Sequence, residues 1–66
     1  MPEPGKYVRR TLVEQVITAE EARADRAGWD PDLCEDAGDG TFVLYTRGEF
    51  GHRIAPVTYE PLRPGS

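Results

Sequence analysis

The chain has 66 residues, a formal net charge of −4 at pH 7 and a single cysteine. A chain this short forms one domain that removes only about 60% of its unfolded surface from water, which leaves little room for an enclosed active site. One cysteine excludes a framework of internal disulfides. The longest apolar run covers residues 42–45, far short of the roughly 20 residues of a membrane-spanning helix. The composition predicts a cytoplasmic protein. Its basic residues are mostly arginines, with a single lysine, which indicates a bacterial source.

Both ends of the chain are rich in proline and glycine, which predicts tails at residues 1–5 and 63–66 around a single domain at residues 6–62. The stretch from Tyr7 to Ile17 is rich in β-branched and aromatic residues. Such a stretch is typical of a strand, so we predict one long first strand there.

A capping box follows this strand at residues 18–21, where Thr18 can accept a hydrogen bond from the Glu21 amide and the Glu21 carboxylate can reach back. It predicts a helix over residues 19–27, and Gly28 offers a left-handed residue to close it. The inward side chains of this helix can only be alanines. The helix is therefore expected to be a thin cover on a sheet.

Residues 30–40 hold a proline, two glycines and five acids, which predicts a loop. Strands are predicted at 41–47 and 53–59, joined by a hairpin connection with two glycines. In the first of these, Phe42 and Leu44 point to one face and Val43 and Tyr45 to the other. Pro56 cannot donate a ladder hydrogen bond, so its strand is predicted to lie at an edge. The predicted fold is a small α+β domain of order β-α-β-β: a three-stranded, mostly antiparallel sheet with one short helix packed on one face.

The charges are segregated along the chain. Residues 14–39 hold nine acids and two bases, a charge of −7, while the remaining three acids and six bases carry +3. An acidic middle disfavours nucleic acid, whose affinity comes largely from Lys and Arg on phosphates. It suits an acidic inhibitor or nucleic-acid mimic that binds a basic protein, an alternative function whose candidate face is Glu20, Glu21, Asp25, Asp30, Asp32, Glu35, Asp36 and Asp39.

Candidate chemical sites are weak. The acidic loop lacks the Asp or Asn at position 34 and the Gly at position 35 that an EF-hand calcium loop needs, so cation binding there stays open. Cys34 and His52 are too few for a zinc site, and the acids after Cys34 suppress its thiolate. We predict no catalytic, cofactor-binding or metal residues, no cofactor and no enzyme activity.

One local resemblance concerns residues 39–56, Asp-Gly-Thr-Phe-Val-Leu-Tyr-Thr-Arg-Gly-Glu-Phe-Gly-His-Arg-Ile-Ala-Pro. This segment resembles the opening hairpin of the MbtH-like proteins, small activators that bind adenylation domains of peptide synthetases. The resemblance covers 18 of the 66 residues. Residues 53–56 stand where that family carries Ser-Leu-Trp-Pro, and the predicted helix precedes the hairpin instead of following it. The resemblance implies an accessory protein of a biosynthetic enzyme.

The main functional prediction rests on the two-faced strand at 41–47. Its second face needs a cover, and exposed apolar patches mark interfaces. We therefore predict a small non-catalytic interaction or regulatory module that binds a protein partner or forms a homodimer, with no membrane partner and with nucleic acid a disfavoured one. The alternative is a monomer whose loop 30–40 folds across that face. The candidate interaction residues are Val43, Tyr45, Trp29, Leu33 and Phe50.

Overall fold

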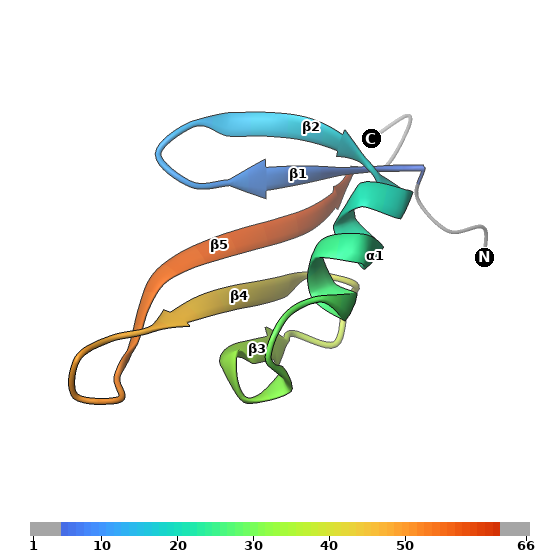
Figure 1. Cartoon of the computed structure of the whole chain (residues 1–66). Helices are drawn as coiled ribbons and strands as arrows, with labels where there is room; N and C mark the ends of the chain where they lie inside the picture. Colours follow the sequence, from blue (N-terminus) through green and yellow to red (C-terminus); the bar gives the residue numbers. More distant parts are fainter. Residues whose placement is uncertain (1–4, 63–66) are drawn as a thin grey trace.

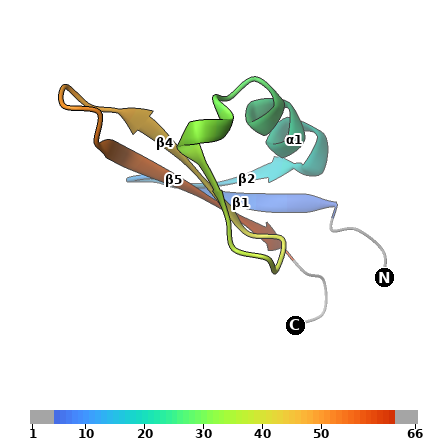
Figure 2. The same cartoon turned by 90° about the horizontal axis from the view of Figure 1, so that it is seen from below.

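The computed structural model of the chain describes residues 5–62, so the predicted tails lie outside the described residues except for Gly5. It contains a five-stranded, wholly antiparallel sheet with one helix on one face (Figures 1 and 2). The sheet order is β2-β1-β5-β4-β3. The elements are β1 (Lys6–Arg10), β2 (Glu14–Thr18), α1 (Ala19–Ala27), the short 3-10 helix η1 (Pro31–Leu33), β3 (Cys34–Asp36), β4 (Phe42–Arg47) and β5 (Arg53–Leu62).

The prediction of a three-stranded sheet is wrong, and its first error concerns the long first strand. That stretch is a hairpin of β1 and β2, in which Tyr7 pairs with Ile17 and Val8 with Val16. The turn is closed by Thr11, whose backbone N–H donates to the Val13 carbonyl. Paired positions add up to 24, so partners share the same parity. Odd residues therefore stay on one face through the turn. The apolar residues of the hairpin thus alternate in the sequence as they would in one long strand.

The second error concerns the acidic loop, which contains η1 and the edge strand β3. Asp30 starts η1, because its carboxylate accepts a hydrogen bond from the Asp32 amide at 2.9 Å. Cys34 then pairs with Leu44 and packs its half-buried side chain against the core. Glu35 and Asp36 are held by ion pairs to Arg53 and Arg26, so Cys34 and two paired acids together place this segment in the sheet.

The predicted edge position of the Pro56 strand is also wrong, since β5 is the central strand. However, β1 pairs only with residues 58–62 of β5, and β4 only with residues 53–59. Pro56 and Pro61 therefore each lie where β5 has one neighbour. A proline lacks an N–H for a second ladder, which explains why both are tolerated in a central strand.

The helix prediction is confirmed at both ends, since α1 spans Ala19–Ala27. The Glu21 amide donates to the Thr18 hydroxyl at 3.1 Å, as the capping box predicts. Gly28 has φ −87°, so the helix ends without the left-handed residue that we expected. Its N–H instead donates to the Ala24 carbonyl.

The core lies between α1 and the sheet. Its buried side chains are Ile17, Ala22, Phe42, Leu44 and Tyr59. Leu44 is 1% exposed, and the Phe42 ring stacks on Tyr59 with 4.7 Å between centroids. Ala22 is fully buried and brings the helix backbone close to these rings. Among the described residues, no helix has the length and apolar character needed to cross a membrane.

Candidate interaction surface

The face of the sheet opposite α1 carries apolar side chains from four strands. Because Phe42 and Leu44 point into the core, Val43 and Tyr45 project from the other side. Figure 2 shows α1 and η1 together on the core side of the sheet. The pairing of the strands adds the even-numbered residues of β1, β2 and the end of β5 to this side. We call the open face the apolar set Val8, Val16, Val43, Tyr45 and Leu62.

Exposure differs across the open face. Val16 is 60% exposed and Leu62 42%, while the other three side chains are half-buried by their neighbours. Sequence reasoning found Val43 and Tyr45 but missed the rest. The parity of Val8 and Val16 was visible, but only the strand pairing shows that they share a side with Val43.

Ion pairs flank the open face at both ends. Arg10 binds Glu14 at 3.2 Å and Glu60 at 3.0 Å. At the other end, the Arg53 guanidinium binds Glu35 at 3.1 Å and lies 5.5 Å from the centre of the Tyr45 ring. Lys6 lies beside Leu62 and Arg47 beside Arg53, so the charged residues on this side are four bases and three acids, a net charge of +1. Because the whole chain carries −4, its other residues together carry −5.

The other three predicted interaction residues do not join this surface. Trp29 lies at the end of α1 on the core side, and its indole N–H donates to the Tyr45 carbonyl at 2.8 Å. Leu33 is half-buried in η1, which lies on the same side. Phe50 is 83% exposed in the turn between β4 and β5, edge-on to His52. The loop at 30–40 with Trp29 and Leu33 therefore does not fold across Val43 and Tyr45 as the monomeric alternative expected.

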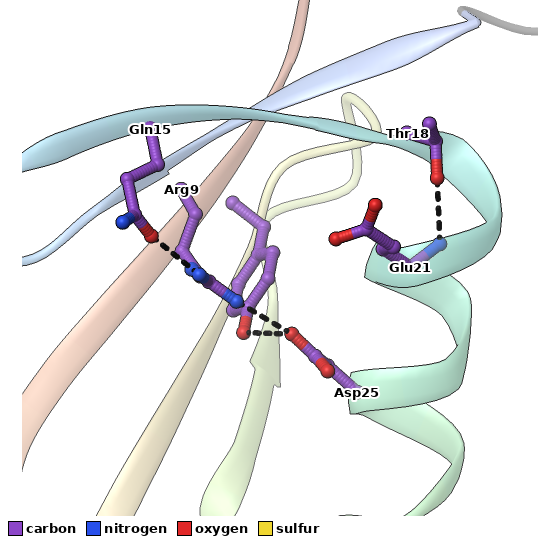
Figure 3. A network of polar contacts seen from close by, with 6 residues as sticks. Arg9, Gln15, Thr18, Glu21 and Asp25 are labelled. Carbon is purple, nitrogen blue, oxygen red and sulfur yellow. Dashed lines mark hydrogen bonds and ion pairs between the residues drawn. The ribbon is translucent and has the colours of Figure 1, made fainter.

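A polar network fastens α1 to the sheet on the core side (Figure 3). The Asp25 carboxylate accepts a 2.7 Å hydrogen bond from the Tyr59 hydroxyl and forms a 3.2 Å ion pair with Arg9. Arg9 also donates to Gln15. Sequence reasoning missed this network, because its members are far apart in the chain and no local pattern links them.

Burial, followed by the hydrogen bond to Asp25, raises the pKa of Tyr59 from 10.0 to about 12. The phenol is therefore kept protonated and is a poor base or nucleophile at neutral pH. Asp25 is shared between two donors, both from the sheet. Together with Trp29, these groups line a shallow depression beside α1. The arrangement holds the helix in place; it does not prepare a group for proton transfer.

The predicted acidic face is spread over α1, η1 and β3, and much of it is already paired. Asp25, Asp30, Glu35 and Asp36 each form an ion pair with an arginine. The hydrogen bond from Arg26, at 2.7 Å, lowers the pKa of Asp36, with help from the Gly38 N–H. The Asp39 carboxylate accepts from the Thr41 amide. Glu20 and Glu21 lie exposed in the first turn of α1, and Asp32 is exposed in η1.

Cys34 and His52 lie in different settings. Cys34 is a half-buried thiol in β3 against the core, whereas His52 is exposed in the β4–β5 turn. Within residues 5–62, no three His, Cys, Asp or Glu side chains gather closely enough to hold a metal ion.

Comparisons with protein-family models, curated proteins and solved structures find no match for this chain. The resemblance to MbtH-like proteins thus remains limited to residues 39–56, which form the end of one loop and the β4–β5 hairpin.

Proposed function

We propose that this protein is a small non-catalytic interaction module that binds another protein chain through its open face. The observation that carries the proposal is a sheet face with five large apolar side chains that no described element covers. Soluble monomers rarely leave contiguous apolar patches of this kind, and such patches commonly mark protein interfaces.

The charge distribution supports the same surface. The open face is bordered by four bases and three acids, while the other residues of the chain together carry −5. An acidic partner surface, including that of a second copy, is repelled by the core side but not by the open face. The partner that fits is a protein with a flat aliphatic surface and charges of both signs around it.

The acidic-mimic alternative has less support. A mimic presents unpaired carboxylates to its basic partner, and four of the eight candidates here are held by arginines of the same chain. Binding through those four would have to compete with ion pairs already formed.

The test is site-specific photo-crosslinking. A benzophenone amino acid replaces Tyr45 on the open face, and a matched variant carries it in place of Glu20, which is exposed on α1. Both variants are irradiated in cells that produce the chain and, separately, as purified protein. We expect a discrete adduct from position 45 and none from position 20.

The mass of the adduct identifies the occupant. An adduct of twice the chain mass in the purified sample means that a second copy covers the open face, and a larger cellular adduct means another protein. Equal labelling at both positions, or a discrete adduct only at position 20, would contradict the proposal.

A further inference from the structure

The two outer edges of the sheet differ in how they are protected. The β3 edge is three residues long and ends in two acids, Glu35 and Asp36, each held by an arginine. Beyond it, Trp29 occupies the exposed edge of β4 by donating to the Tyr45 carbonyl. Short, charged and covered edges are the usual means of preventing strand addition.

The β2 edge is longer and carries a single charge, Glu14, at its first residue. Residues 14–18 form a regular strand that, in the part of the chain the structure describes, pairs only with β1. It holds no lysine, proline or bulge, and Val16 at its centre is 60% exposed. Figure 1 shows β2 as the outermost strand, with α1 running from its end toward β3 and away from the free edge. Its outward backbone N–H and C=O groups are therefore available to another strand.

We propose that β2 pairs antiparallel with β2 of a second copy, with the two-fold axis at Val16. This register places Val16 opposite its copy, Gln15 opposite Ile17 and Glu14 opposite Thr18. It uses the whole strand and brings no like charges face to face. A two-fold interface of this kind uses the same patch on both copies and closes at a dimer.

Charge complementarity favours this register. Thr18 pairs with Lys6 inside each copy, so Glu14 of one copy lies two strands away from Lys6 of the other, on the same face. That separation is about 10 Å between backbones, a gap that a glutamate and a lysine side chain can bridge together. Glu14 already pairs with Arg10 of its own copy at 3.2 Å, so its carboxylate would be shared between Arg10 and Lys6. Lys6 is exposed and forms no ion pair with any described residue. The symmetry creates the contact twice.

The edge dimer also enlarges the open face. Five strands spaced about 4.8 Å apart, with a mean length of about 19 Å, give a face on the order of 500 Å², below the roughly 800 Å² per partner of a standard interface. Joining two sheets edge to edge places both open faces on one side of a ten-stranded sheet. The combined face then reaches the standard size. This last consequence rests on the proposed function; the edge pairing does not.

Cysteine trapping tests the register. In a Cys34→Ser background, Val16→Cys places two thiols directly opposite each other across the two-fold axis, close to disulfide distance. Glu14→Cys is the matched control, because in the same dimer its thiols lie four residues apart along the strands, about 13 Å. Under mild oxidation at micromolar concentration, we expect the Val16→Cys chain to form disulfide dimers at least tenfold faster.

Sedimentation of the chain without added cysteines measures the association itself. We expect a concentration-dependent dimer whose dissociation constant rises at least tenfold in Val16→Lys, where two lysines meet. Val13→Lys should leave it nearly unchanged, because Val13 is equally exposed but lies in the turn. Circular dichroism checks that each variant is folded.

Equal trapping rates at positions 16 and 14, or a strictly monomeric chain at hundreds of micromolar, would overturn the edge dimer. A Val43→Cys variant separates this failure from that of the proposed function. If it traps fastest, the second copy sits on the open face instead of the edge.

Discussion

The bond between Tyr59 and Asp25 offers a test of how α1 is held on the sheet. Tyr59→Phe removes the hydroxyl that donates to Asp25 at 2.7 Å and leaves the ring that stacks on Phe42. A hydrogen bond to a charged group contributes about 1.5–3 kcal/mol when desolvated. Asp25 is 35% exposed and keeps its ion pair with Arg9, so water and the guanidinium replace part of that bond. We therefore expect the variant to lose about 1–1.5 kcal/mol of unfolding free energy at pH 7.

The same bond predicts a pH dependence. The folded chain keeps the Tyr59 proton up to a pKa of about 12, whereas the unfolded chain releases it near 10.0. The unfolded state thus binds fewer protons between these values, and stability falls as pH rises through them. The contribution is complete below pH 10 and lost above pH 12. At pH 11 the loss is about 1 kcal/mol, because one pKa unit corresponds to roughly 1.4 kcal/mol and solvent near the hydroxyl reduces it.

Urea unfolding at pH 7, 9 and 11, followed by tryptophan fluorescence, measures both effects. The stability gap between the parent chain and Tyr59→Phe should be constant from pH 7 to 9 and should shrink at pH 11. Tyr7→Phe is the matched control, since it removes a hydroxyl from a ring that also packs on Phe42. A gap below 0.3 kcal/mol at pH 7, or one that widens at pH 11, would refute the role assigned to the Tyr59 hydroxyl.

Three further changes test local features by the same urea assay. Thr18→Ala removes the N-cap hydroxyl of α1 and should cost about 1 kcal/mol, whereas Thr18→Ser should cost much less. The Arg26 hydrogen bond lowers the pKa of Asp36 below 3.8, so this bond stabilises the folded chain above that pH and the stabilisation is lost as pH falls. In Asp36→Asn, the free energy of unfolding should therefore fall less steeply between pH 4 and 2 than in the parent chain. Ala55 has φ 52°, which costs an L-residue about 1–2 kcal/mol, so Ala55→Gly should stabilise the chain by roughly 0.5 kcal/mol after the entropy cost of glycine. Gly40→Ala, at φ 94°, should destabilise the chain instead. If both substitutions changed the free energy of unfolding in the same direction, the strain argument would be contradicted.

The elements with local signals were predictable from the sequence. The capping box located α1, and alternating apolar residues located β4 and its buried face. The β1–β2 hairpin was not predictable by alternation, because a turn that pairs residues of equal parity preserves the pattern of one long strand. β3 was hidden for a different reason. Its residues are mostly acidic, and they join the sheet through Cys34 and through ion pairs to arginines that only the tertiary structure brings near.

The candidate site depends even more on long-range register, and a single bulge in β5 shows why. Leu44 pairs with Val57 and Thr46 with Ile54, so Tyr45 alone opposes two residues of β5. One extra residue reverses the side to which every later position points. Strict alternation from Val57 and Tyr59 would send Arg53 to the core side. The bulge sends it to the open face, where it binds Glu35 and lies over Tyr45. One of the charges on the open face thus depends on a backbone irregularity, and no composition or periodicity of the chain encodes it.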